Sequence, residues 1–367
     1  MRNILICVGL ILGFSANTRS EEIPIWIGTG SRDAAGIYLV KLNTDSGKLS
    51  QPMVAGEIGG AGFLAKSKDG KFLYSLCSEE KGSVAAFRIK DDHTLELINT
   101  MPTGDGGAAH LAVDDAGKIL LSAQYGGGSV TSYALRADGG IDRVTATFEH
   151  EGSGPNPQRQ KAPHPHWIGF SPDQSYAFCP DLGIDQIVVY QVDHETQALV
   201  ETERRGITIP GGGPRHMKFD PAGAQVYLLN ELIPSVTRFG YDAETGALEQ
   251  IDTIKSLSDE AIASELRVTA SEIRFHPSGK FLYSANRGHD SITAYAVAED
   301  GSLSVVEVEP VRGAWPRNFN LDPSGKWLVA AGRHTNTLTV FAVDQETGAL
   351  TYSAVAANVP APICVEF

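Results

Sequence analysis

A strand–turn–strand unit recurs along this chain and limits the folds that are open to it. It is clearest in "KFDPAGAQVYLLN" from Lys218, "RFHPSGKFLYSAN" from Arg274 and "NLDPSGKWLVAAG" from Asn320. Each copy joins a short apolar strand to a second one through a Pro-x-Gly turn. A polar loop, an alternating third strand and a weaker fourth strand follow each time. Such repeated short strands with regular turns predict antiparallel all-β structure.

Three further segments fit the same frame. They begin "LAKSKDGKFLYSLC" at Leu64, "LAVDDAGKILLSAQ" at Leu111 and "IGFSPDQSYAFCPD" at Ile168. The turn residues of the six copies are Gly70, Gly117, Gln174, Gly223, Gly279 and Gly325. Their spacing of roughly 45 to 60 residues is typical of four-stranded propeller blades.

A seventh copy is divided between the two ends of the chain. The final "ICVEF" is similar to a first strand, and "IPIWIGTGSRDAAGIYLVKLNTDSGKL" near the start supplies the remaining strands. Pairing the two ends would close a ring and remove exposed sheet edges. We therefore predict one seven-bladed β-propeller over residues 21–367, whose closing blade is shared by N- and C-terminal strands. A pair of β-sandwiches is the alternative, but it would not explain the divided repeat.

The first 20 residues have the pattern of an export signal. Arg2 precedes an apolar run from Ile4 to Phe14, and small residues follow it. The run is short for a membrane span. We expect residues 1–20 to be a signal peptide that is cleaved between Ala16 and Ser20, giving a periplasmic or secreted protein. An uncleaved anchor is the alternative.

Composition narrows the class of partner. The net charge of −14 argues against nucleic acid and anionic membrane surfaces as partners.

Beyond Cys7, the cysteines Cys77, Cys179 and Cys364 show no CxxC spacing, so we expect them to be buried strand residues, with one disulfide as the alternative. We expect a monomer without a cofactor or a metal ion, acting on a small molecule.

The repeat also indicates where polar side chains gather. Because the second strand returns alongside the first, the start of one and the end of the other lie at the same mouth of the central channel. Eight residues before the turn stand Gly62, Ala109, His166, Arg215, Ser271 and Arg317; eight after it stand Ser78, Tyr125, Leu182, Glu231, Arg287 and Arg333. An acidic protein that concentrates cations at one mouth is suited to a small anionic ligand.

This pattern gives two sets of candidate residues. The candidate catalytic residues are His166, Arg215, Glu231 and Arg287. The candidate substrate-binding residues are His164, Asp181, His216, Asn230, Asn286, His289, Arg317 and Arg333. A purely structural interpretation also exists, in which Arg215 and Glu231 form an ion pair within one hairpin and Asp and Asn cap turns. The His-x-His pair in "KAPHPHW" is a weak metal signal, without a third ligand at close spacing.

Several of these segments resemble one family. "PHPHWIGFSPD", "GGGPRHMKFDP", "LLNELIPSVT", "SANRGHDSITAYAV" and "WPRNFNLDPSGKW" are similar to the seven-bladed propeller lactonases, over essentially the whole chain after residue 20. That family includes bacterial 6-phosphogluconolactonase and a fungal carboxy-muconate cyclase. The resemblance implies a site of one His, two Arg and one Glu. Motif by motif these are Arg215, Glu231 and Arg287, with the repeat register favouring His166 over His164.

The resemblance and the charge pattern together suggest hydrolysis of a sugar-acid or related lactone. In this hypothesis Arg287 and Arg317 hold an anionic or polyhydroxy tail, and Arg215 stabilises the oxyanion. Either Glu231 or His166 activates water, and the other protonates the leaving group. The alternatives are a lactone-forming muconate-type cyclase, a metal-dependent lactonase, and a non-catalytic propeller that binds a small anion or a protein partner.

Overall fold

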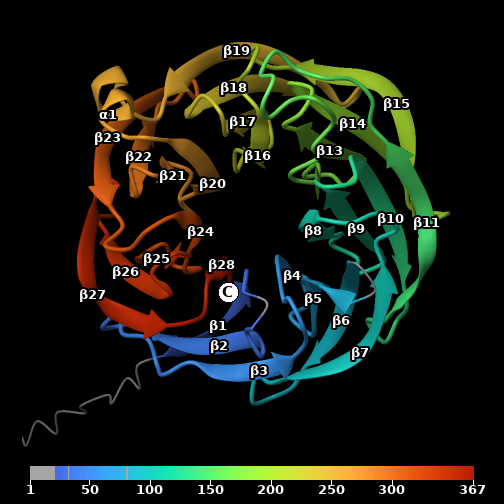
Figure 1. Cartoon of the computed structure of the whole chain (residues 1–367), viewed down its shortest axis with the longest axis horizontal. Helices are drawn as coiled ribbons and strands as arrows, with labels where there is room; N and C mark the ends of the chain where they lie inside the picture. Colours follow the sequence, from blue (N-terminus) through green and yellow to red (C-terminus); the bar gives the residue numbers. More distant parts are fainter. Residues whose placement is uncertain (1–20, 32, 80–81) are drawn as a thin grey trace, which may run out of the picture.

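The computed structural model describes residues 21–31, 33–79 and 82–367. These residues form seven four-stranded antiparallel sheets arranged as blades around a central axis (Figure 1). The predicted seven-bladed β-propeller is therefore confirmed. The expected signal peptide, including its cleavage site and Cys7, lies outside the described residues.

The blades follow one another along the chain, and each begins with its innermost strand (Figure 1). Blade 1 contains β4 (Leu64–Lys66), β5 (Phe72–Cys77), β6 (Ser83–Ile89) and β7 (Leu95–Pro102); blade 2 contains β8 (Ala108–Val113), β9 (Ile119–Gln124), β10 (Ser129–Leu135) and β11 (Ile141–Glu149). Blade 3 contains β12 (Gly169–Phe170), β13 (Tyr176–Asp181), β14 (Gln186–Asp193) and β15 (Ala198–Ile207); blade 4 contains β16 (Pro214–Phe219), β17 (Gln225–Asn230), β18 (Ser235–Asp242) and β19 (Ala247–Lys255). Blade 5 contains β20 (Thr269–Phe275), β21 (Phe281–Arg287), β22 (Ser291–Val297) and β23 (Leu303–Pro310); blade 6 contains β24 (Pro316–Leu321), β25 (Trp327–Gly332), β26 (Thr337–Val343) and β27 (Leu350–Asn358).

The closing blade joins the two ends of the chain, as the divided repeat predicts. It contains β28 (Pro362–Glu366), β1 (Glu22–Thr29), β2 (Gly36–Asn43) and β3 (Met53–Glu57). Strand β28 is the innermost strand of this blade and pairs antiparallel with β1. The ring thus closes through hydrogen bonds between strands that lie more than 300 residues apart in the sequence.

The repeated turn has a common backbone conformation. Every turn residue identified from the sequence has a φ between +64° and +74°, and this includes Gln174 as well as the glycines. Glycine adopts this left-handed conformation without a steric penalty, whereas other residues rarely do. The backbone therefore explains why five of the six copies carry Gly at this position.

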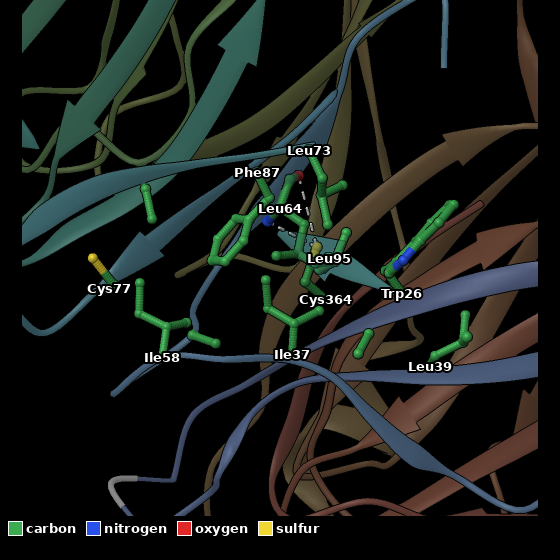
Figure 2. Close-up of a cluster of buried hydrophobic side chains, with 13 residues drawn as sticks. Trp26, Ile37, Leu39, Ile58, Leu64, Leu73, Cys77, Phe87, Leu95 and Cys364 are labelled. Atoms are coloured by element: carbon green, nitrogen blue, oxygen red, sulfur yellow. Dashed lines mark hydrogen bonds between the residues drawn. The ribbon is translucent and has the colours of Figure 1, made fainter. Parts of the chain in front are cut away.

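The hydrophobic core lies between neighbouring blades. One cluster packs Trp26, Ile37 and Leu39 of the closing blade against Leu73 and Phe87 of blade 1 (Figure 2). Burying each large side chain of this kind contributes roughly 1.5–3 kcal/mol. Among the described residues the three cysteines are unpaired and buried, and Cys364 belongs to this cluster, where its sulfur accepts a hydrogen bond from the amide of Leu64. They fill space in strands and form no disulfide.

A single short helix, α1 (Asp259–Ala263), is found in the described part of the chain. It lies in the connection from β19 to β20 at the rim of the ring (Figure 1). None of the described residues belongs to a helix with the length and apolar character that crossing a membrane requires.

Candidate active site

An extra residue interrupts the two inner strands of several blades at the same level. In blade 4, Pro214 pairs with Asn230 and His216 pairs with Leu229, which leaves Arg215 without a partner in the ladder. Blade 6 has the same register shift at Arg317. Such β-bulges bend a strand and redirect a side chain, and they are frequent beside active sites. The bulge is thus the local feature that carries each arginine to the channel.

The carboxylate of Glu231 is the centre of the charged cluster. Its Oε2 atom accepts a hydrogen bond from Nε of Arg215 at 2.9 Å and lies 3.0 Å from Nη2 of Arg287. Its Oε1 atom accepts a hydrogen bond from Nη2 of Arg159 at 2.8 Å. Nε2 of His166 lies 3.8 Å from Oε2. Glu231, Arg215, Arg287 and His166 are all buried, so these charges interact with little screening.

The environment sets the charge of each member of this cluster. Burial alone would raise the pKa of the Glu231 carboxyl, but Arg287 and Arg215 hold it well below its usual range. Burial, followed by the positive charge of Arg215, holds the pKa of His166 well below its ordinary value. Burial lowers the pKa of Arg215 to about 9, so this guanidinium is still charged at neutral pH. The site therefore combines an ionised carboxylate with a neutral imidazole.

These groups border a cavity of about 330 Å³, called the mouth cavity below. Its charged and aromatic lining consists of Arg159, Arg267, Arg287, Arg317, Arg333, Glu231, His166, Tyr125 and Trp315. Gly107, Ala108 and Ala109 complete the wall. A site with five guanidinium groups and one carboxylate is suited to an anionic ligand, because guanidinium binds carboxylate and phosphate through paired hydrogen bonds.

Three of the five arginines have no carboxylate partner within the described parts of the chain. Arg159 and Arg287 are engaged by Glu231, whereas Arg267, Arg317 and Arg333 form no ion pair with any described residue. Burial, and then the charge of Arg287, lowers the pKa of Arg317 to about 10. Like charges gathered in this way repel one another, and a bound anion would relieve that repulsion.

Small residues from blades 1 and 2 leave space beside the charged groups. Gly62 and Ala109 occupy the positions of blades 1 and 2 that correspond to Arg215 and Arg317. A second cavity of about 70 Å³, lined by Gly62, Phe63, Arg215, His216 and Arg317, lies next to the mouth cavity and shares Arg317 with it. The site is therefore asymmetric: blades 4 to 6 contribute charged groups, whereas the small residues of blades 1 and 2 leave room for a ligand.

The structure brings seven of the twelve residues expected from the sequence to these two cavities. His166, Glu231, Arg287, Arg317 and Arg333 line the mouth cavity, and Arg215 lies beside it, bonded to Glu231. His216 lines the smaller cavity, where its Nδ1 atom lies 3.1 Å from Oε1 of the buried Glu272.

Five of the expected substrate-binding residues line neither of these two cavities. Asn230 and Asn286 donate hydrogen bonds to hydroxyls of the next strand in their own blades, Ser235 and Thr237 or Ser291 and Thr293. Side chains alternate between the two faces of a strand. Because Glu231 and Arg287 project into the cavity, the residue before each of them turns back into its sheet.

The remaining three have local structural contacts. The buried carboxylate of Asp181 accepts hydrogen bonds from the amides of His164 and Gly183, and it fixes the loop that enters blade 3. The ring of His164 stacks on Tyr125 with centroids 4.5 Å apart. His289 lies 2.8 Å from the Ser291 hydroxyl through Nδ1 and borders a different, mostly apolar cavity near α1.

Four charged or aromatic residues of the mouth cavity were not among the candidates. Arg159 comes from the long loop before blade 3, and Arg267 and Trp315 come from the loops that precede β20 and β24. Tyr125 occupies a rim position of the repeat, and its hydroxyl accepts a hydrogen bond from Arg159. The loops differ in length from blade to blade, so the repeat register does not predict where Arg159, Arg267 and Trp315 lie. Tyr125 could have been included, since it occupies the position of Glu231 in its own blade.

The part of the chain that the structure describes contains no group of three or more His, Cys, Asp or Glu side chains placed to bind a metal ion. His166 and His164, the His-x-His pair, diverge: one ring faces Glu231 and the other stacks on Tyr125.

The chain is similar to known proteins over almost its whole length. A family model described as "Lactonase, 7-bladed beta-propeller" matches residues 24–367. The 6-phosphogluconolactonase of Bacillus subtilis strain 168 is 34% identical over 346 residues, which cover 93% of this chain and 97% of the relative. The 6-phosphogluconolactonase of Formosa agariphila is 32% identical over 331 residues, with coverages of 88% and 92%. The solved structure of a periplasmic gluconolactonase from Pseudomonas aeruginosa superposes with a TM-score of 0.86 at 26% identity, covering 95% of this chain and 99% of that one.

Proposed function

Because this chain belongs to the seven-bladed β-propeller lactonase family, we propose that it hydrolyses a sugar-acid lactone in the mouth cavity. The observation that carries this proposal is the pairing of an ionised Glu231 with a neutral His166 in a cavity that five arginines also line. The carboxylate and the imidazole can handle protons, and the arginines can stabilise negative charge. No serine nucleophile is required.

His166 is the general base in this proposal. Both oxygens of Glu231 already accept close contacts from guanidinium groups, whereas Nε2 of His166 has no partner within hydrogen-bonding distance among the described residues. A water molecule that contacts both Nε2 and Oε2 can give its proton to the imidazole while its oxygen attacks the lactone carbonyl. Glu231 then stabilises the imidazolium that forms.

The rest of the reaction follows from this proton transfer. Attack of the water oxygen converts the carbonyl into a tetrahedral oxyanion. When this intermediate collapses, the ring C–O bond breaks and the alkoxide takes the proton from His166. The products are one carboxylic acid and one hydroxyl in an open chain, and the imidazole returns to its neutral form. The acid then ionises and releases one proton to the solvent.

In this proposal Arg317, and not Arg215, stabilises the tetrahedral oxyanion. Arg317 borders both cavities and has no ion-pair partner among the described residues. Arg215 borders only the smaller cavity and donates its Nε hydrogen to Glu231, so it positions the carboxylate. A preorganised cation directed at developing negative charge is commonly one of the largest contributions to catalysis.

The unpaired arginines favour a substrate that carries an acidic group besides the lactone. Relatives of this chain are named 6-phosphogluconolactonase and gluconolactonase. Among these two substrates, the phosphorylated one places a dianion where Arg333 and Arg267 can bind it. We therefore propose a phosphorylated aldonolactone as the preferred substrate and an unphosphorylated one as a weaker substrate.

We also propose that the protein is exported. The sequence of residues 1–20 supports this, as does the structural neighbour that is described as periplasmic. Amino-terminal sequencing of protein recovered from the periplasm or the medium tests the proposal. A mature N-terminus between residues 17 and 21 is expected, and a cytoplasmic protein beginning at Met1 would contradict it.

A panel of substrates separates hydrolysis from the other functions of this fold. Purified protein is assayed in a pH-stat with 6-phosphogluconolactone, δ-gluconolactone and a muconolactone, with spontaneous hydrolysis subtracted. Saturable proton release supports the proposal. Binding without turnover would favour a non-catalytic binder, turnover of the muconolactone alone would favour a cyclase, and loss of activity with a chelator would favour a metal-dependent enzyme.

A further inference from the structure

Trp315 has a backbone conformation that is uncommon for a large side chain. Its φ is +61°, in the left-handed region that favours glycine. Its amide donates a hydrogen bond to Oδ1 of Asp290 at 2.8 Å, and its carbonyl accepts one from the amide of Arg333 at 3.2 Å. The fold therefore imposes this conformation, and its result is to place the indole ring at the wall of the mouth cavity.

The indole of Trp315 contacts two arginines of that cavity. The guanidinium carbon of Arg287 lies 5.4 Å from the ring centroid, and that of Arg267 lies 5.8 Å from it. His334 stacks on the same ring with centroids 5.0 Å apart and planes inclined by 12°. A ring that already contacts three side chains offers little free surface to a sugar, but it is well placed to orient cations.

Arg267 differs from the other arginines of the cavity. It lies in the connection that contains α1, and its side chain is exposed, while that of Arg287 is buried. Its backbone is nevertheless close-packed, because a Cβ at Gly288 would lie 1.8 Å from the Arg267 carbonyl oxygen. Within the described residues no carboxylate pairs with its guanidinium. Arg267 is thus a cation on a fixed backbone, held toward the cavity by an aromatic ring.

We propose that Arg267, oriented by Trp315, is the specificity residue for the acidic group at the end of the substrate remote from the lactone ester. This inference rests on the proposed function for the identity of the substrate. Glu231 and His166 define the end of the cavity where the ester reacts, and Arg287 connects that end to the Trp315 ring. A phosphate ester bound between Arg267 and Arg333 would receive two guanidinium partners that no described carboxylate occupies.

Binding of open-chain acids tests the role of Arg267 without requiring catalysis. Calorimetric titrations compare 6-phosphogluconate with gluconate for the wild-type protein and for Arg267→Ala. The wild type is expected to bind the phosphorylated acid more tightly. The Arg267→Ala variant is expected to lose about tenfold to a hundredfold in affinity for 6-phosphogluconate, as for one charged hydrogen-bonding group, and to change little toward gluconate.

A matched control is available at the same rim. Arg312 also lies over an aromatic ring, with its guanidinium carbon 5.8 Å from the centroid of Tyr352, but it pairs with Glu309 and does not line the mouth cavity. Arg312→Ala is expected to bind both acids like the wild type. Equal affinity of wild type and Arg267→Ala for 6-phosphogluconate would overturn the inference. Tight selective binding without any lactone turnover would instead refute the proposed function and leave the inference standing.

Trp315 is a positioning residue in this account, and its test must separate positioning from general stability. Trp315→Phe keeps an aromatic face and is expected to retain the preference for 6-phosphogluconate, whereas Trp315→Leu is expected to lose it. In an Arg267→Ala background, Trp315→Leu should cause no further loss of that preference. A preference that survives in Trp315→Leu, or an additive loss in the double variant, would show that Trp315 does not act through Arg267. Thermal unfolding of each variant identifies any that lose the fold. If Trp315→Leu is one of these, the preference measured for Trp315→Phe decides whether Trp315 positions Arg267.

Discussion

Nε2 of His166 lies 3.8 Å from Oε2 of Glu231, while the three arginines that contact this carboxylate lie at 2.8 to 3.0 Å. The gap is too long for a direct hydrogen bond, yet it lets one water molecule contact both atoms. Because burial keeps the imidazole neutral and the arginines keep the carboxylate ionised, the pair is prepared to remove one proton from that water.

Replacing His166 by Asn is expected to remove the general base. Turnover of a lactone substrate should fall by about 10²- to 10⁴-fold. The wild-type kcat/KM should be constant from neutral pH to well below pH 6.5 and fall only at more acidic pH, because a base acts only when unprotonated and burial holds the pKa of His166 well below 6.5. The residual activity of His166→Asn should lack this acid limb. His194→Asn, at an exposed turn after β14, serves as the control, and an unchanged acid limb in His166→Asn would contradict the assignment.

Replacing Glu231 by Gln is expected to reduce both activity and stability. The variant leaves Arg215 and Arg287 buried without a full counter-charge, and breaking a buried ion pair costs about 3–5 kcal/mol. Thermal unfolding and initial rates are measured together. Glu272→Gln is the matched control, since Glu272 is an equally buried carboxylate that does not line the mouth cavity. Similar destabilisation of both variants with loss of activity only in Glu231→Gln is expected; equal activities would remove Glu231 from the reaction.

Three buried histidines should make the stability of the fold depend on pH. Burial holds the pKa values of His110, His166 and His216 well below 6.5. Below pH 6.5 the unfolded chain therefore binds protons that the folded protein does not, and the free energy of unfolding falls as pH falls. Each histidine contributes up to about 1.4 kcal/mol per pH unit. Denaturant titrations at pH 7.5 and 5.5 measure this effect, and equal free energies at the two pH values would contradict it.

Replacing Arg317 by Ala is expected to act mainly on the rate of the chemical step. Removing one donor to a developing oxyanion commonly lowers kcat by about 10²- to 10³-fold. Arg333→Ala should instead raise KM for a phosphorylated lactone while changing kcat little. Steady-state kinetics of the two variants side by side distinguish these roles. If Arg317→Ala raised KM and left kcat unchanged, Arg317 would bind the ground state and another group would hold the oxyanion.

The sequence was sufficient to predict the propeller, its seven blades and the level of the site, because the turn residues define one register for six of the blades. That register brings His166, Arg215, Glu231 and Arg287 together from three different blades. It also selected Asn230 and Asn286, which lie one residue before Glu231 and Arg287. Because side chains alternate along a strand, two neighbouring residues cannot both point into the same cavity, and this rule could have been applied to the sequence.

Other features of the site depend on tertiary structure that the repeat does not encode. The β-bulges at Arg215 and Arg317 change the face of the strand on which a side chain lies, and no residue type in the sequence predicts them. Arg159 reaches Glu231 from a loop that lies 72 positions away in the sequence. Trp315 lies in the loop before β24, in a conformation that a sequence pattern would assign to glycine.

The central claim is tested most directly by the rate of proton release from 6-phosphogluconolactone. This rate is measured in a pH-stat at pH 7.5, in the presence and in the absence of protein comprising residues 21–367. The wild-type protein should accelerate hydrolysis beyond the spontaneous rate with saturation in substrate, and His166→Asn should remove nearly all of that acceleration. A wild-type rate equal to the spontaneous rate, or an undiminished rate in His166→Asn, would contradict the account.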